Sequence, residues 1–166
     1  SLVQQRYRAR RALLGKLDSV IIEPADENPV AGIAFLCHGY GAPGDDLAAL
    51  AGELLNQRES EQRVRLVFPA GPLTLDEMGL PEGRAWWNIS IQALITSMEQ
   101  GRYEAIREQD PEGIDTARQM LVEAIEAGLN QSQLDHRHLL LGGFSQGAML
   151  TMETSLLGLS APPSAI

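Results

Sequence analysis

Leu139-Leu140-Leu141-Gly142-Gly143-Phe144-Ser145-Gln146-Gly147 is the stretch that decides the fold. Its first part, residues 139–143, is a short apolar run of the kind that forms a buried strand. Its second part, residues 143–147, fits the pattern G-x-S-x-G, in which small residues allow a sharp turn from a strand into a helix. The sequence therefore predicts a strand, a tight turn with Ser145 at its tip, and a helix.

A serine at such a turn has a specific chemical use. A serine hydroxyl is a poor nucleophile, so a hydrolase exposes its oxygen, surrounds it with backbone donors and places a base beside it. We interpret Ser145 as a nucleophile and the N–H of Gln146, at the start of the helix, as one donor of an oxyanion hole. The alternative is a glycine-rich turn that serves only packing.

The second donor is expected after an earlier strand. Residues 32–37 are apolar without alternation, which is typical of a strand covered on both faces, and they lead into a glycine-rich loop. The glycines let the backbone approach a substrate carbonyl, so we assign the N–H of Tyr40 as the partner of Gln146. The other loop residues are expected to support it: His38, Gly39 and Gly41.

Apolar runs of strand length alternate with helical patterns along the chain. Strands are expected at residues 20–22, 32–37, 64–68 and 139–143, and helices at residues 47–55, 86–109, 110–128 and after Ser145. This alternation predicts an α/β fold with a mostly parallel central sheet and helices on both faces. The 166 residues are interpreted as a single domain.

Several details of these elements follow from local signals. Asp110 and Pro111 are expected to start a helix that Gly128 ends. Residues 69–83 are rich in Pro and Gly and are expected to form a long loop, of a kind that is usually functional or disordered. In the helix after Ser145, the inward residues are expected to be Ala148, Met149 and Met152.

Four motifs carry a resemblance: Leu36-Cys37-His38-Gly39-Tyr40-Gly41, Phe68-Pro69-Ala70-Gly71-Pro72, Arg84-Ala85-Trp86-Trp87-Asn88 and Gly142-Gly143-Phe144-Ser145-Gln146-Gly147-Ala148. In this order they resemble the phospholipase/carboxylesterase family of the α/β-hydrolase superfamily, which includes the acyl-protein thioesterases. The resemblance implies the α/β-hydrolase fold and a Ser-Asp-His hydrolase of esters or thioesters, with lysophospholipase-like activity within its range. It also implies that the Trp86–Trp87 segment borders an acyl pocket.

The residues themselves favour an apolar pocket beside the loop. Trp86 and Trp87 follow a segment that carries Leu73 and further apolar residues, and together they could form a wall for an acyl group. We therefore assign Trp86, Trp87 and Leu73 to the substrate pocket. The alternative, left open for each tryptophan, is that it anchors the loop to the core.

The base of a serine hydrolase has no counterpart here. The triad in this fold runs Ser, then Asp or Glu, then His, but after Ser145 the chain has no Asp, no His and only Glu153. His136 and His138 precede the strand and are expected about 20 Å from the serine, at the wrong end of the sheet. His38, oriented by Asp45 or Asp46, is an unconventional alternative for the base. We expect the chain to be C-terminally truncated, with residues 161–166 approaching another strand, and nearly inactive by itself.

The charge and cysteine content of the chain limit the kinds of partner and compartment that we expect. A net charge of −9 and a pI near 4.7 argue against nucleic acid or an anionic membrane, and no apolar run supports stable membrane insertion. The single Cys37 fits a buried residue in a cytoplasmic protein. We expect an acyl ester or thioester substrate, no cofactor and no metal, and an exposed sheet edge that favours a homodimer. The alternative function is a binding protein of this fold that has lost its base.

Overall fold

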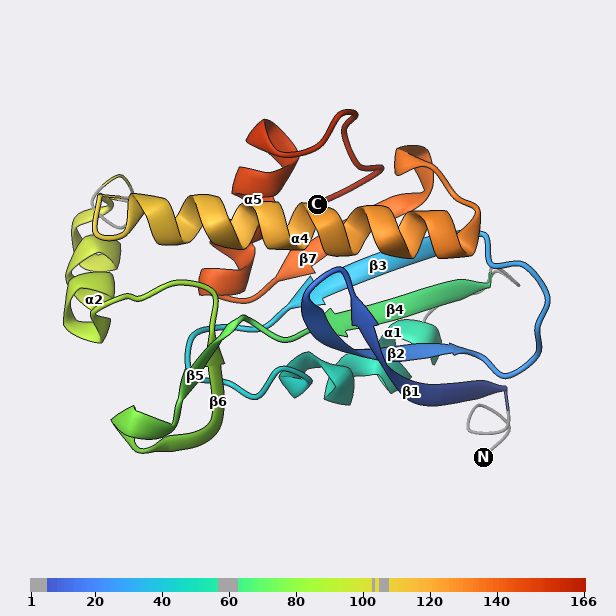
Figure 1. Cartoon of the computed structure of the whole chain (residues 1–166), viewed down its shortest axis with the longest axis horizontal. Coiled ribbons are helices and arrows are strands. Elements are labelled where there is room, and N and C mark those ends of the chain that lie inside the picture. Colours follow the sequence, from blue (N-terminus) through green and yellow to red (C-terminus); the bar gives the residue numbers. More distant parts are fainter. Residues whose placement is uncertain (1–5, 57–62, 103, 105–107) are drawn as a thin grey trace.

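The fold, in a computed structural model that describes residues 6–56, 63–102, 104 and 108–166, is built on a five-stranded sheet (Figure 1). The strands, in sequence, are β1 (Tyr7–Leu14), β2 (Leu17–Pro24), β3 (Gly32–Cys37), β4 (Val64–Pro69) and β7 (Leu139–Gly143). Their order across the sheet is β1-β2-β4-β3-β7. β4, β3 and β7 run parallel, whereas β2 is antiparallel to both of its neighbours. The α/β prediction is confirmed, with a mixed sheet whose parallel part carries Ser145.

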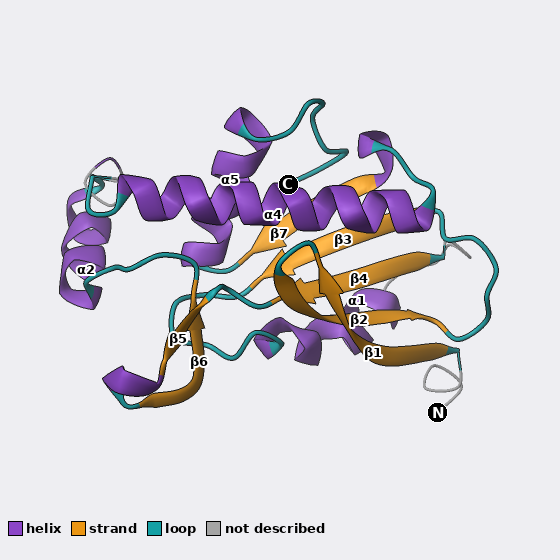
Figure 2. Ribbon diagram, viewed as in Figure 1, coloured by secondary structure: helices purple, strands orange, loops and turns teal. Residues whose placement is uncertain are grey.

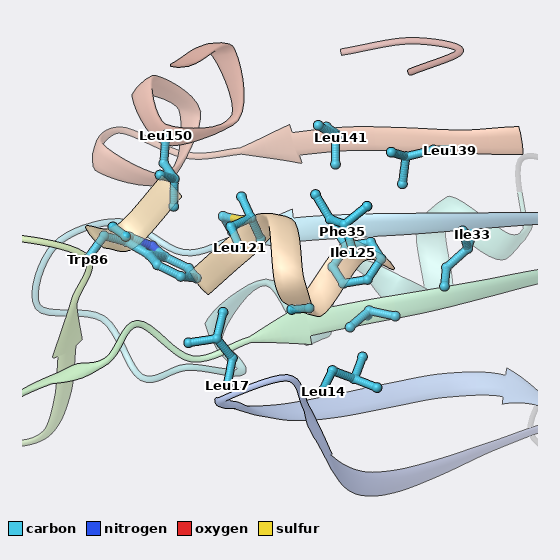
Figure 3. Close-up of a cluster of buried hydrophobic side chains, with 14 of the residues drawn as sticks. Leu14, Leu17, Ile33, Phe35, Trp86, Leu121, Ile125, Leu139, Leu141 and Leu150 are labelled. Carbon is cyan, nitrogen blue, oxygen red and sulfur yellow. The ribbon is translucent and has the colours of Figure 1, made fainter. Parts of the chain in front are cut away.

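Helices cover both faces of the sheet (Figure 2). On one face lie the long helix α4 (Pro111–Ser132) and α5 (Gln146–Leu157), whose apolar residues form the larger core with Phe35 and Leu141 (Figure 3). On the other face, a 3₁₀ turn (Asp46–Leu50) leads into α1 (Ala51–Asn56), which contributes Ala51 to a smaller core with Phe68. The single helix predicted at residues 47–55 is thus two shorter turns of different type.

The first strand, β1, was not predicted. It is an edge strand that pairs only with β2, and arginines occupy three of its eight positions. Two of them face a buried carboxylate: Arg10 donates to Glu23 of β2, and Arg8 lies 3.5 Å from the same side chain. Burial by itself raises the pKa of Glu23, but hydrogen bonds from Arg10 and Arg65 hold it below the ordinary value. The arginines therefore complete an ion-pair network.

Three helix predictions need correction. α4 does not end at Gly128 but continues to Ser132, because Gly128 serves close packing: a Cβ there would lie 2.8 Å from the Phe35 ring. Within residues 86–109, where one helix was predicted, α2 (Ile91–Gln100) begins after its N-cap Ser90 and ends at Gly101; Glu104 is helical again, and residues 103 and 105–107 lie outside the described part. In α5, Met152 is 57 % exposed rather than inward.

The segment predicted as a long loop contains a β-hairpin. β5 (Leu73–Leu75) and β6 (Leu80–Ala85) pair antiparallel, and a 3₁₀ turn (Asp76–Met78) joins them. At the other end of the chain, the Leu141 N–H donates to the Ala165 carbonyl at 3.0 Å, so residue 165 pairs in parallel with β7. This is an isolated bridge, and a further strand after residues 161–166 stays a prediction.

Candidate active site

Ser145 lies at a strained turn between β7 and α5. Its backbone has φ 54° and ψ −116°, a region that residues other than glycine rarely adopt, and α5 begins at the next residue, Gln146. Such a conformation persists only where the surrounding structure enforces it. The predicted strand, turn and helix are confirmed.

The two glycines of the G-x-S-x-G pattern are required by contact. A Cβ on Gly147 would lie 2.1 Å from the carbonyl oxygen of Cys37, and one on Gly143 would lie 2.5 Å from the Gly147 carbonyl carbon. No side chain fits at such distances. The glycines therefore let the start of α5 pack directly on the end of β3, and this packing holds Ser145 in its strained conformation.

The loop after β3 lies against the serine turn. β3 and β7 are neighbours in the sheet, with Cys37 opposite Gly143, and the Phe144 N–H donates to the Cys37 carbonyl at 3.0 Å. A Cβ on Gly39 would lie 3.4 Å from the Ser145 Cβ. The two glycine-rich loops thus meet at one edge of the sheet, as the sequence predicted.

Two backbone donors at this edge are free. Within the described residues, no hydrogen bond has the N–H of Tyr40 or of Gln146 as its donor. Gln146 is the first residue of α5, where helix N–H groups have no partner inside the helix and the helix dipole favours negative charge. Both groups are therefore available to an oxyanion, but nothing bound in the structure tests this role.

His38 is occupied as a loop support. It is fully buried, its Nε2 accepts the Gly71 N–H at 2.9 Å, and its Nδ1 lies 2.7 Å from the Gly39 carbonyl. An accepting Nε2 places the proton on Nδ1, which then donates to Gly39. Burial lowers the pKa of His38, which keeps the ring neutral. With both nitrogens engaged, His38 fits the predicted structural role better than that of a base.

The other candidate bases lie elsewhere. His136 and His138 form a 3₁₀ turn directly before β7, at the end of that strand opposite to Ser145, and His136 lies 2.8 Å from Glu126. Glu153 lies in α5, 3.4 Å from Arg118. None of these side chains is placed to accept a proton from Ser145.

Trp86 and Trp87 are both 1 % exposed, and each is held differently. The Trp86 indole N–H donates to the His38 carbonyl at 3.0 Å, and its ring stacks on the His38 ring with centroids 5.3 Å apart. The Trp87 indole N–H has no partner among the described residues. This burial fits the alternative that both tryptophans anchor the loop, and contact with a substrate remains a prediction.

The sequence did not predict the hydrogen bonds between the Gln146 side chain and the Trp86–Trp87 segment. The side chain of Gln146 accepts the Trp86 N–H at 2.9 Å and donates to the Trp87 carbonyl at 2.9 Å. Because the partners are about 60 residues apart in sequence, no local pattern indicates this pairing. The available signal was that a polar residue, Gln146, stands at a position that is buried.

The β5–β6 hairpin borders the loop that follows β3, residues 38–42, which we call the oxyanion loop after its predicted role. Leu73 is half-buried opposite Ala85, directly before the tryptophans. At the tip, the Tyr40 hydroxyl lies 3.4 Å from the Met78 sulfur, and Leu80 comes within 3.5 Å of the Cβ position of Gly41. Met78 and Leu80 remain 61 % and 39 % exposed. Apolar side chains therefore lie beside the Tyr40 hydroxyl and Gly41.

A cleft of about 580 Å³ lies between the β1–β2 hairpin and residues 43–45, and none of the predicted site residues lines it. Its walls carry both signs of charge, including Arg84 and Glu82. Within the described part of the chain, no group of three or more His, Cys, Asp or Glu side chains is placed to hold a metal ion. Nor is any described helix both long and apolar enough to cross a membrane.

A family model described as Phospholipase/Carboxylesterase matches residues 17–160, which is most of the chain and includes both glycine-rich loops. The chain belongs to this family. Acyl-protein thioesterase 1 of Kluyveromyces lactis is a relative, 28 % identical over 129 residues that make up 77 % of this chain and 51 % of the relative. This chain therefore spans about half the length of that relative.

Solved structures agree on the fold. Esterase PE8 matches with a TM-score of 0.64 and 24 % identity, over 95 % of this chain and 60 % of the esterase. A carboxylesterase from Mesorhizobium loti matches with a TM-score of 0.63 and 16 % identity, over 93 % of this chain and 60 % of its own. The family member described here thus has the α/β-hydrolase fold and spans between half and two thirds of the length of these proteins.

Proposed function

We propose that the protein is a serine hydrolase that cleaves carboxylic esters or thioesters through an acyl-Ser145 intermediate. The observation that carries the proposal is the strained backbone of Ser145, with φ 54°, at the tip of a turn that glycine contacts enforce. Strain of this kind is concentrated at functional sites, because there it holds a reacting group in place. A packing turn has no need of a serine in this conformation.

The attack follows from the donors around the serine. The Ser145 oxygen adds to the substrate carbonyl carbon, and the carbonyl oxygen becomes an oxyanion that accepts hydrogen bonds from the N–H groups of Tyr40 and Gln146. Neither donor has a partner among the residues that the structure describes, so both can stabilise the charge without reorganisation. As the tetrahedral intermediate collapses, the bond to the leaving oxygen or sulfur breaks, and that atom takes the proton that the base removed from Ser145. Water then attacks the acyl-Ser145 ester, which releases the acyl group as a carboxylic acid and restores the Ser145 hydroxyl.

The proton of Ser145 needs an acceptor, and we propose that residues outside this 166-residue sequence supply it. Both ring nitrogens of His38 are engaged, and His136 lies at the far end of β7. The relatives are longer than this chain and have room for the missing Asp and His. The 166 residues alone should retain only the residual advantage of an oxyanion hole, on the order of 10³ to 10⁴ over water.

The proposed substrate carries an acyl chain. The apolar side chains of Met78 and Leu80 beside Tyr40 favour an acyl group over a charged one, and a named relative is a thioesterase. The family and its relatives favour this hydrolase over a binding protein without catalysis. A cytoplasmic location and a homodimer stay predictions.

The test compares substrates and chain lengths. The complete gene product that contains these residues should hydrolyse p-nitrophenyl esters of short or medium acyl chains and acyl thioesters, but not peptides. The 166-residue chain should be nearly inactive. Peptide cleavage without ester cleavage would exclude the proposed substrate class, and full turnover by the short chain would exclude an external base and make His38 the next residue to mutate.

A further inference from the structure

We propose that the side chain of Gln146 is a positioning residue that keeps the two oxyanion donors in register, an inference that rests on the proposed hydrolase function. One of these donors is the backbone N–H of Gln146 itself. Its side chain holds the segment to which the loop of the other donor, Tyr40, is attached.

The Gln146 amide behaves like a peptide group added to the Trp86–Trp87 segment. It is fully buried, its Oε1 accepts the Trp86 N–H at 2.9 Å, and its Nε2 donates to the Trp87 carbonyl at 2.9 Å. Only a side chain with both an acceptor and a donor at this length satisfies both partners. Glutamate lacks the donor when ionised, and methionine, which has a similar shape, lacks a strong hydrogen-bonding group. A side chain at position 146 therefore needs a hydrogen-bond donor and an acceptor as well as the volume of glutamine.

Residues 84–86 form hydrogen bonds with the oxyanion loop before and after Tyr40. Before Tyr40, the His38 carbonyl accepts the Trp86 indole N–H at 3.0 Å. After it, the Gly41 N–H donates to the Arg84 carbonyl and the Arg84 N–H donates to the Ala42 carbonyl, both at 2.9 Å. The loop around Tyr40 is thus fixed to residues 84–86, and these are fixed to Gln146.

This arrangement predicts a specific kinetic defect. Without the Gln146 amide, the Trp86–Trp87 segment loses its link to α5, and the Tyr40 N–H shifts relative to the Gln146 N–H. A shift of about 1 Å in a catalytic group costs up to about 100-fold in rate. Because the oxyanion is absent from the bound ground-state substrate and develops in the transition state that leads to the tetrahedral intermediate, kcat should fall while KM changes little.

The experiment uses the complete gene product and Gln146→Met, with Gln119→Met on the exposed face of α4 as the matched control. For p-nitrophenyl ester hydrolysis, we expect kcat of Gln146→Met to fall about 10-fold to 100-fold, with KM within about threefold. A boronic acid, which mimics the tetrahedral intermediate, should lose affinity in parallel with kcat. Gln119→Met should leave all three quantities unchanged.

A second variant gives a readout that does not need activity. The two tryptophans of the chain, Trp86 and Trp87, are the segment that Gln146 holds, so their fluorescence reports the contact. Gln146→Glu should shift their emission to longer wavelength when its carboxyl is ionised. The shift should reverse at low pH, where the protonated carboxyl can both accept and donate.

The outcomes separate the two proposals. If kcat and boronic acid affinity of Gln146→Met match those of the parent while Ser145→Ala is inactive, the positioning role is wrong and the hydrolase stands. If KM rises while kcat is unchanged, Gln146 acts on substrate binding instead, and the inference is again overturned. Hydrolysis that survives Ser145→Ala would remove the proposed function and, with it, this inference. Should Gln146→Met fail to fold, Gln146→Glu decides by the same kinetic criteria.

Discussion

Because the backbone of Ser145 is strained, we predict that Ser145→Gly is more stable than Ser145→Ala. Ser145→Gly and Ser145→Ala both lose the hydroxyl, but alanine keeps the Cβ that disfavours φ 54°. Strain in a sparsely populated backbone region costs about 1 to 3 kcal/mol, and glycine carries an entropic penalty of about 0.5 to 1 kcal/mol on folding. The difference leaves Ser145→Gly more stable than Ser145→Ala by about 1 kcal/mol.

Urea unfolding, followed by tryptophan fluorescence, measures this difference. Thermal unfolding should show the same order, with midpoints about 2 to 4 °C apart for a chain of this size. Ser155 provides the control, because it lies inside the same helix, α5, at an ordinary helical position. There, glycine should be less stable than alanine by about 1 kcal/mol.

The sign of the difference decides the question. If glycine is less stable than alanine at position 145 by as much as at position 155, the backbone of Ser145 stores no strain. The interpretation that the surrounding contacts hold Ser145 in a strained conformation would then lose its physical basis. If the order inverts between the two positions, the serine is held against its own preference, as the contacts of Gly143 and Gly147 require.

Three further predictions concern the surroundings of the serine. Gly147→Ala should cost more than about 2 kcal/mol of unfolding free energy, measured with urea, because its Cβ would meet a carbonyl oxygen at 2.1 Å; a cost below about 0.5 kcal/mol would contradict the packing. Trp86→Phe should be about 1 to 2 kcal/mol more destabilising than Trp87→Phe, since among the described residues the Trp86 indole N–H has a partner and the Trp87 indole N–H has none, and equal losses would refute the bond's contribution. Burial lowers the pKa of His38 in the folded state, so stability should fall as pH drops below the unfolded pKa of about 6.5, and the fall should be weaker in His38→Gln; parallel pH profiles would refute this.

The sequence was sufficient to predict the centre of the fold because buried parallel strands leave a clear pattern. β3 and β7 are covered on both faces, so their residues form continuous apolar runs. The turn at Ser145 was predictable for a related reason, since its glycines are imposed by local contacts that any residue with a side chain would break. Local geometry of this kind is visible in a short motif.

Features that depend on distant contacts were not predictable. Two of the arginines of β1, Arg8 and Arg10, pair with Glu23 of the next strand, a partner that their own segment does not reveal. Gly128 resembled a helix end, but it is a contact with Phe35 from another element. The side chain of Gln146 pairs with backbone about 60 residues earlier. In each case, the residue type is explained by a partner that the local sequence does not reveal.

α5 shows the same limit in its burial. Its buried positions include Thr151 and Thr154, whereas Met152 and Leu156 are 57 % and 76 % exposed. The Thr154 hydroxyl has no hydrogen-bond partner among the described residues. Hydrophobicity alone therefore did not identify every buried position of α5, because small residues such as Thr151 and Thr154 are buried beside Leu150.

The most direct test of the account is covalent trapping of the nucleophile. The complete gene product is treated with a fluorophosphonate, digested and mapped by mass spectrometry, with Ser145→Ala as the control. We predict one adduct, on the peptide that contains Ser145, together with loss of both the adduct and ester hydrolysis in Ser145→Ala. An adduct on a different residue, or hydrolysis by Ser145→Ala at the parental rate, would contradict the assignment of Ser145 as the nucleophile.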